Sequence, residues 1–538
     1  MKKEQTMKKA LILAIAIVAV LALVGCSGDP DPIGDSSSSG GGDPSSSSVG
    51  GDPSSSSVGD DPSSSSVGDE PSSSSVGGDP SSSSVGDNYD PLPYGTLYAT
   101  PYKPQMILGS CWLFASNAVL ETHIKKTTGV QVSLSENHAK VGIFASRLGM
   151  TDRTAMGGNA VMAGTYWMRG ELGGPVLTQD DRPYNTDINS TDWNPNAPRY
   201  GRVTNMQWVL DPTLEFPRDN PGYDLEFRNN IKEAIYNYGS VGGSYWSSGQ
   251  PKHDSPRGFT YYFNNPDETS ESNSNSRTDH AIQILGWDDN FPAGNFSNPP
   301  PGNGAWYVKD SKSNGVSFHW ISYYQFFSPI FFVAGFEPQP VGNVYDYTPQ
   351  ATNWSYTNGT AGATRYWSNI FDCTDENANL EEVIIYASTG STYRIYVATD
   401  EITQDAVGDI ALLNSAFINK VAELTVNSSE PVNKYNGFYT LKLSSSIPIG
   451  NKSFAIVIEG TPLSQTQQRV YHLRTSYNEN FRSAPRESYY STSGVNVQNK
   501  TWTDYHSNRI ADNTHGNFYI YAVVSGSNGQ SDKGRVFK

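Results

Sequence analysis

The chain has 538 residues and a formal net charge of −17, with 36 % hydrophobic and 12 % aromatic residues. This length is too great for one ordinary domain, and the aromatic content excludes a chain that is disordered throughout. The acidic balance argues against the basic face that nucleic-acid binding requires, so no nucleic-acid partner is predicted.

Residues 1–25 have the pattern of an export signal. Lysines at positions 2, 3, 8 and 9 precede an apolar run from Ala10 to Val24, which is shorter than the roughly 20 residues that a membrane-spanning helix needs. The run ends in Leu23-Val24-Gly25-Cys26, which resembles the lipobox of bacterial lipoproteins. The resemblance implies an exported lipoprotein, lipidated at Cys26 and held by its lipid anchor in a membrane at the cell envelope or cell surface. An ordinary cleaved secretory signal is the alternative.

Residues 26–88 comprise this cysteine and a predicted linker. A nine-residue unit of the form Asp/Glu-Pro-Ser-Ser-Ser-Ser-Val-Gly plus one residue repeats from Asp43, and the charged residues of the linker are all acidic. Proline disfavours helix, serine and glycine keep the chain solvated, and one valine per unit cannot build a core. The sequence therefore predicts an extended tether.

The first candidate for chemistry follows the linker. Cys111 comes after a Gly109-Ser110 turn and begins a helical pattern that runs from Trp112 to about Thr122. A thiol at a helix N-terminus lies at the positive end of the helix dipole, which favours the nucleophilic thiolate. Cys111 is therefore the predicted nucleophile, and a buried structural cysteine is the alternative.

This turn resembles the papain family of cysteine peptidases. The family signature C-G-[SA]-C-[WY] matches as Gly109-Ser110-Cys111-Trp112, with Leu108 at the position of its first cysteine. The resemblance implies hydrolysis of protein or peptide substrates through a thioester acyl-enzyme, with Gln105 as an oxyanion-hole donor. Acyl transfer needs preorganised donors, and a side-chain amide together with a backbone N–H can supply two.

His280 is the predicted general base. It begins an apolar strand pattern from Asp279 to Asp289, and a residue at a strand start faces one defined side. The other histidines of this half lack a suitable position or pattern: His123, His138, His253 and His319. The family histidine has the same Asp-His-Ala context. It lies 169 residues after Cys111 here, against about 130–150 in papain-like enzymes, and an inserted hydrophilic loop from Ser247 to Asn275 accounts for the excess.

The third catalytic position departs from the family. In the segment from Gly304 to Lys312, Asp310 stands where the family has the orienting asparagine, and Lys312 where it has the shielding tryptophan. An aspartate can still accept a hydrogen bond from the imidazole, and its charge would stabilise imidazolium beside thiolate. The prediction is a competent site that is slower or shifted in pH optimum. A catalytically retired peptide- or glycan-binding lipoprotein is the alternative.

Six further residues are predicted by resemblance to bind substrate: Gly157, Gly158, Asn159, Ala160, Thr278 and Asp279. The glycines match the strand that hydrogen-bonds the substrate backbone, where a missing side chain lets an extended peptide approach. Transglutaminase-like enzymes share the Cys-His-Asp order. The position of Gln105, the segment 157–160 and the wide Cys–His spacing favour the papain resemblance.

The character of the chain changes after Gly335. Six strand patterns follow, at 380–387, 391–398, 421–426, 437–443, 452–459 and 517–524, separated by turn residues. They predict a β-sandwich that resembles the lectin-like domain behind papain-type peptidases of exported bacterial proteins. Its aromatic residues, including Trp354, Tyr366 and Trp367, are interpreted mainly as core, and stacking on a carbohydrate is the alternative.

The predicted fold class is α+β, with a two-lobed papain-like domain, helical half plus β half, followed by an all-β sandwich. The predicted divisions are 1–25, 26–88, 89–337 and 341–527. No cofactor motif and no metal site are predicted. With Cys26 lipidated and Cys111 catalytic, Cys373 is left unpaired and no intrachain disulfide is expected.

Overall fold

The computed structural model describes most of the chain beyond residue 93. The described residues are 94–145, 157–169, 173–187, 190–209, 225–248, 251–263, 278–312, 316–327, 329–338, 342–347, 354–359, 364–399, 402–404, 410–412, 417–427, 433–462, 466–472, 488–491, 502–504 and 517–525. The predicted leader, Cys26 and the repeat linker lie outside these residues.

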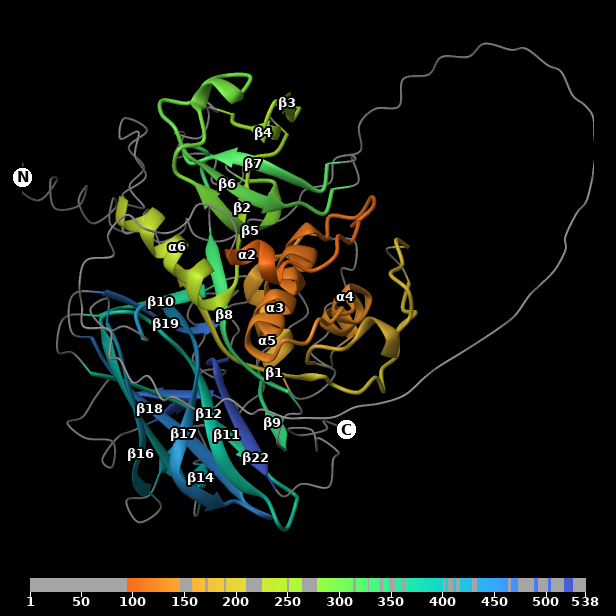
Figure 1. The fold of residues 1–538 in the computed structure, drawn as a ribbon. Helices are drawn as coiled ribbons and strands as arrows, with labels where there is room; N and C mark the ends of the chain where they lie inside the picture. Colours follow the sequence, from red (N-terminus) through yellow and green to blue (C-terminus); the bar gives the residue numbers. More distant parts are fainter. Residues whose placement is uncertain are drawn as a thin grey trace, which may run out of the picture. The chain divides into compact units, whose positions relative to one another are not determined.

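The helical half is built around α3 (Cys111–Thr128), whose side chains are buried from Cys111 to Ile124. The helix passes the predicted end near Thr122 and stops at Gly129, which has a φ of 75° and donates to the Lys125 carbonyl. Glycine adopts this left-handed conformation without steric penalty, which explains the end point. The neighbouring helices, seen around α3 in Figure 1, are α2 (Tyr94–Tyr98), α4 (Glu136–Ala145), α5 (Ala160–Met168) and α6 (Leu225–Tyr238).

The β half consists of seven described strands after α6. They are β2 (Val241–Tyr245), β3 (His253–Ser255), β4 (Gly258–Tyr261), β5 (His280–Asp288), β6 (Ala305–Lys309), β7 (Phe318–Ser322) and β8 (Ile330–Pro338). The interpretation of Ser247 to Asn275 as a loop was wrong for its first part. There β3 and β4 form a hairpin, and β4 pairs in parallel with β7. Pro256-Arg257-Gly258 makes the turn because Gly258 has a φ of 95°.

The β half continues into the second domain as one sheet. Its twelve strands follow the order β3-β4-β7-β6-β5-β2-β8-β1-β17-β12-β22-β9. Strand β1 (Gly201–Val209) joins the two parts, since it pairs with β8 on one side and with β17 on the other. The second-domain strands of this sheet are β9 (Asn343–Tyr345), β12 (Asn379–Ala387), β17 (Asn436–Pro448) and β22 (Ile520–Ser525).

A six-stranded sheet packs against that end and completes the predicted β-sandwich. Its strands are β11 (Arg365–Asp372), β13 (Ser391–Ala398), β16 (Phe417–Val426), β18 (Ser453–Pro462), β20 (Ser488–Ser491) and β21 (Thr503–Asp504). The six strands predicted from the sequence are all present across the two sheets, as β12, β13, β16, β17, β18 and β22. In β13 the expected alternation buries Tyr393, Ile395 and Val397. Tyr366 and Trp367 are 6 % and 4 % exposed, so neither presents an open face to a sugar ring.

The hydrophobic core also crosses from one domain to the other. Leu120 of α3 and Trp167 of α5 belong to the same buried cluster as Ile384, Phe438 and Tyr521 of the sandwich sheet. The helices of the first domain therefore pack on a face that the second domain helps to build.

Candidate active site

The helix α3 and the strand β5 meet at Cys111. Cys111 is the first residue of α3 and is fully buried. The hydroxyls of Ser110 and Tyr184 share a hydrogen bond of 2.6 Å, which fixes the turn before the helix. The backbone N–H of Ala281 donates to Cys111 Sγ at 3.3 Å. The sulfur thus lies at the positive end of the helix dipole and against the residue that follows His280.

The other described cysteine, Cys373, is free and buried.

His280 and Asp310 are joined as the sequence predicts. His280 is the first residue of β5, a strand that is buried along its whole length between β2 and β6. Its Nε2 lies 2.7 Å from Oδ1 of Asp310, the residue that follows β6. Since Asp310 occupies Nε2, Nδ1 is the ring nitrogen that can serve the thiol. The three residues come from three different elements.

The Asp310 carboxylate is fully buried. Its Oδ1 also accepts from the Lys312 backbone N–H at 2.8 Å, and its Oδ2 accepts from Lys252 Nζ at 2.7 Å. Burial by itself would raise the pKa of Asp310, but the charge and hydrogen bond of His280, with Lys252 behind it, hold this pKa well below its usual range. The group is therefore a carboxylate at neutral pH.

Gln105 is held beside this segment by three hydrogen bonds. Its backbone N–H donates to the Ser311 carbonyl at 2.9 Å, and its Oε1 accepts from the Ser311 hydroxyl at 2.7 Å. Its Nε2 donates to the Leu108 carbonyl at 2.8 Å. The Leu108 bond uses one of the two Nε2 hydrogens, and an amide in this position has a second to donate to an oxyanion.

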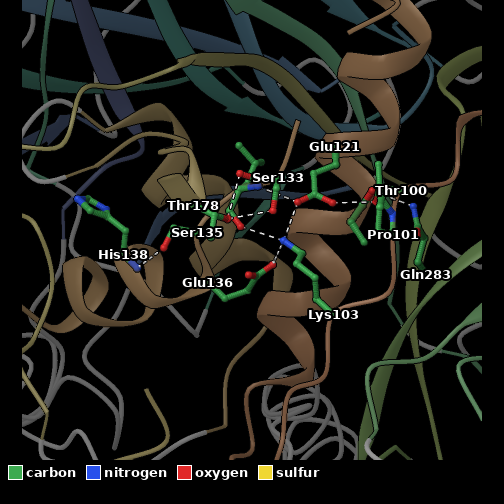
Figure 2. Close-up of polar contacts among 12 residues, drawn as sticks. Thr100, Pro101, Lys103, Glu121, Ser133, Ser135, Glu136, His138, Thr178 and Gln283 are labelled. Atoms are coloured by element: carbon green, nitrogen blue, oxygen red, sulfur yellow. Dashed lines mark hydrogen bonds and ion pairs between the residues drawn. The ribbon is translucent and has the colours of Figure 1, made fainter. Parts of the chain in front are cut away.

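A network of buried charges secures the segment that leads to Gln105 (Figure 2). Lys103 forms ion pairs with Glu121 of α3, at 2.7 Å, and with Glu136 of α4. Glu121 also accepts from the Thr100 hydroxyl at 2.8 Å, and Lys309 of β6 donates to the Thr100 carbonyl at 3.0 Å. The helical half and the β half are thus tied through the chain just before Gln105.

The predicted substrate-binding residues at 157–160 differ in what their side chains or backbone contact. A Cβ at Gly158 would lie 2.3 Å from the Trp112 ring, so this glycine permits close packing on the residue after the nucleophile. Asn159 Oδ1 caps α5 by accepting from the backbone of Val161 and Met162 at 3.0 and 3.2 Å. That side chain is therefore engaged with its own helix. The neighbouring Gly157 and Ala160 are both buried.

Two predicted substrate residues precede β5. The Thr278 hydroxyl is buried and has no hydrogen-bond partner among the described residues. Asp279 is partly buried and accepts from the Ser247 N–H at 2.5 Å and from the Ser248 hydroxyl. Contact of these residues with substrate stays a prediction.

Two side chains, Lys252 and His319, lie near the candidate catalytic residues and were not placed there from the sequence. Lys252 lies in the hydrophilic stretch that had no recognisable pattern, although the Pro-Arg-Gly turn signal after it could have indicated the hairpin. His319 of β7 is 1 % exposed, and neither ring nitrogen has a hydrogen-bond partner within the described parts of the chain. Burial, and then the charge of Lys252, lower the pKa of His319 to about 3.

The described helices include none that is long and apolar enough to cross a membrane. The same residues contain no cluster of three or more His, Cys, Asp or Glu side chains that could hold a metal ion.

Comparison with known proteins agrees with the geometry. Residues 88–315 match the description "papain family cysteine protease", and residues 344–523 match "lectin like domain". A comparison with curated proteins finds no match. Two solved structures of Cwp84 share the fold at 22 % identity. The clostridial cysteine protease after propeptide cleavage covers 81 % of this chain and 99 % of its own, with a TM-score of 0.63.

The second structure contains the cysteine protease and lectin-like domains of Cwp84, a surface layer associated protein of Clostridium difficile. It covers 81 % of this chain and 88 % of its own, with a TM-score of 0.61. The family matches favour papain-type over transglutaminase-like chemistry. The chain is a cysteine peptidase, with a papain-family domain over residues 88–315 followed by a lectin-like domain over residues 344–523.

Proposed function

We propose that this peptidase is a surface-anchored endopeptidase that works through a thioester acyl-enzyme. The observation that carries the proposal is that the sulfur of Cys111, the first residue of α3, accepts from the backbone N–H of Ala281, while the preceding residue, His280, is bonded to the buried Asp310. His280 Nδ1 takes the thiol proton, and the thiolate attacks the carbonyl carbon of the scissile bond. The oxyanion is held by Gln105 Nε2 and the Cys111 backbone N–H.

The tetrahedral intermediate then collapses, the C–N bond breaks, and the leaving amine takes the proton from His280. A thioester to Cys111 remains. Water attacks this thioester while His280 accepts a proton, and the carboxylic acid leaves as the thiol is restored.

The test compares the two described cysteines after reduction. We expect Cys111 to react with iodoacetamide at neutral pH at least about 100-fold faster than Cys373, since Cys111 lies at a helix N-terminus and is served by His280 in this proposal, whereas Cys373 has neither. Cys373 is 3 % exposed and accepts a hydrogen bond from the Tyr345 hydroxyl at 3.5 Å. Hydrolysis of casein should fall in step with alkylation of Cys111.

The control is Cys373→Ala, which should keep both the fast reaction and the hydrolysis. Equal, slow alkylation of both thiols, or hydrolysis that persists after Cys111 is fully modified, would contradict the proposal. Equal reactivity together with retained peptide or glycan binding is the result expected of a retired site.

The surface location is supported by the Leu23-Val24-Gly25-Cys26 pattern and by the surface-layer association stated for Cwp84. In this proposal the lipidated Cys26 anchors the chain and the acidic repeat holds the peptidase away from the membrane. Replacing Cys26 by alanine is expected to move the protein from the membrane fraction to the medium, as followed by immunoblot. An unchanged distribution would rule out the lipid anchor.

A further inference from the structure

Asp310 places a buried negative charge where the family has the neutral side chain of asparagine. A fully buried negative charge is strongly unfavourable unless it is paired and hydrogen-bonded. His280 and the Lys312 backbone N–H satisfy Oδ1, and Lys252 Nζ lies 2.7 Å from Oδ2. The side chain of Lys252 is only 9 % exposed. The ion pair between Lys252 and Asp310 is therefore itself buried.

Lys252 reaches the site from the inserted hairpin. It directly precedes β3, and β4 of the same hairpin pairs with β7. The chain that precedes the hairpin is also held at Ser247, whose N–H donates to Asp279 and whose hydroxyl accepts from Lys312 Nζ at 2.7 Å. The insertion thus brings a lysine to the carboxylate and fixes it there.

We propose that Lys252 is a positioning residue of the catalytic site, which neutralises Asp310 and holds its carboxylate in line with His280. The Asp310–Lys252 pair together then has the net charge of the single neutral amide found in the family. The lysine acts on the reaction only through Asp310 and His280. This inference rests on the peptidase function proposed above.

Two other ionisable side chains near His280 are uncharged, so Asp310 and Lys252 are its main charged neighbours. Tyr245 of β2 lies opposite His280 in the sheet, with ring centroids 6.0 Å apart, and burial raises its pKa well above the usual value. His319 of β7 has its pKa lowered to about 3. Both are therefore neutral at neutral pH.

Two further charged groups lie beside the same strands. Asp279 is bonded to Ser247 and Ser248 at the start of the hairpin, and the Lys312 ammonium is bonded to Ser247. On α3, the group that contacts β5 at this point is the Cys111 sulfur, which accepts from the Ala281 N–H. Within this set, Asp310 is bonded directly to His280, and Lys252 is bonded to Asp310.

The test separates charge from shape with Lys252→Gln, Asp310→Asn and the double variant. Lys252→Gln keeps a donor for Oδ2 but leaves the Asp310 charge uncompensated, which stabilises the imidazolium. The alkaline limb of the pH profile should move up by about one unit, with kcat/KM lower by about tenfold. Asp310→Asn leaves a buried ammonium and should move the limb down, with a similar or larger loss.

The double variant restores a neutral pair, because a glutamine carbonyl can accept from the asparagine amide. We expect its kcat/KM to exceed the product of the two single effects by about tenfold, the sign of a coupled pair. The measurements are kcat/KM and the rate of Cys111 alkylation against pH. Lys232→Gln is the matched control, since Lys232 is 11 % exposed and pairs with Asp289 at 2.6 Å at the other end of β5.

An alkaline limb that stays in place or moves down in Lys252→Gln would overturn the proposal. So would losses in the double variant equal to the product of the singles. If the wild-type chain fails to hydrolyse protein and Cys111 alkylates slowly, the peptidase function itself is wrong. An active wild type with an unaffected Lys252→Gln variant rejects only the role of Lys252.

Discussion

Replacing Arg202 by methionine is expected to lower the free energy of unfolding by about 3–5 kcal/mol, the range for breaking a buried ion pair. Arg202 lies in β1 and its side chain is 1 % exposed. One guanidinium nitrogen lies 2.6 Å from Glu382 of β12 and 2.7 Å from Glu337 of β8. Methionine keeps most of the volume but leaves the largely buried Glu382 carboxylate without its cation.

Urea unfolding followed by tryptophan fluorescence measures this effect, and one transition is expected because the two domains share a sheet and a core. Arg394→Met is the matched control. Arg394 also contacts two glutamates but is 40 % exposed, so its loss should be about 1 kcal/mol or less. Adding Glu382→Leu to Arg202→Met should recover much of the stability. A loss below about 1 kcal/mol in Arg202→Met would show that the pair does not stabilise the junction.

Replacing Gln105 by alanine is expected to lower kcat by about 100- to 1000-fold with little change in KM, as for other oxyanion-hole donors. The reason is that the amide donates to charge that appears only in the transition state. Alkylation of Cys111 by iodoacetamide forms no oxyanion. Its rate should therefore stay close to that of the wild-type chain.

Ser311→Ala is the control for position. It removes the hydrogen bond to Gln105 Oε1 but leaves the donating nitrogen, held by its bond to the Leu108 carbonyl. Its loss of kcat should be much smaller, on the order of a single neutral hydrogen bond. If Gln105→Ala and Ser311→Ala were equally impaired, or if alkylation fell in parallel with kcat, Gln105 would be structural.

The candidate catalytic residues could be proposed from the sequence because each depends on local structure. Cys111 follows a turn and begins a helix, and His280 begins an apolar strand, so short motifs place both. The partner of Asp310 was not predictable in this way. Lys252 lies 58 residues before Asp310, in a polar stretch without periodicity, and the pairing of β4 with β7 brings it into position.

The strands of the second domain were likewise visible from alternation, as in β13. The pairing of these strands with the sheet of the peptidase domain could not be predicted in this way. Strand β1 pairs with β17 through contacts such as Asn205 with Tyr439, which are far apart in sequence. Neither strand carries a local signal for its partner, because backbone hydrogen bonds are the same for any sequence.

The joint between β1 and β17 also sets an order of assembly. During synthesis from the N-terminus, β8 can pair with one side of β1 as soon as it has been made. On the other side of β1, the backbone groups of residues 205–208 stay without their strand partner until residues 436–439 have been made. Until then the peptidase half has an open sheet edge, which is prone to pair with other chains. The proteolytic half is therefore completed late, when most of the lectin-like half has already been made.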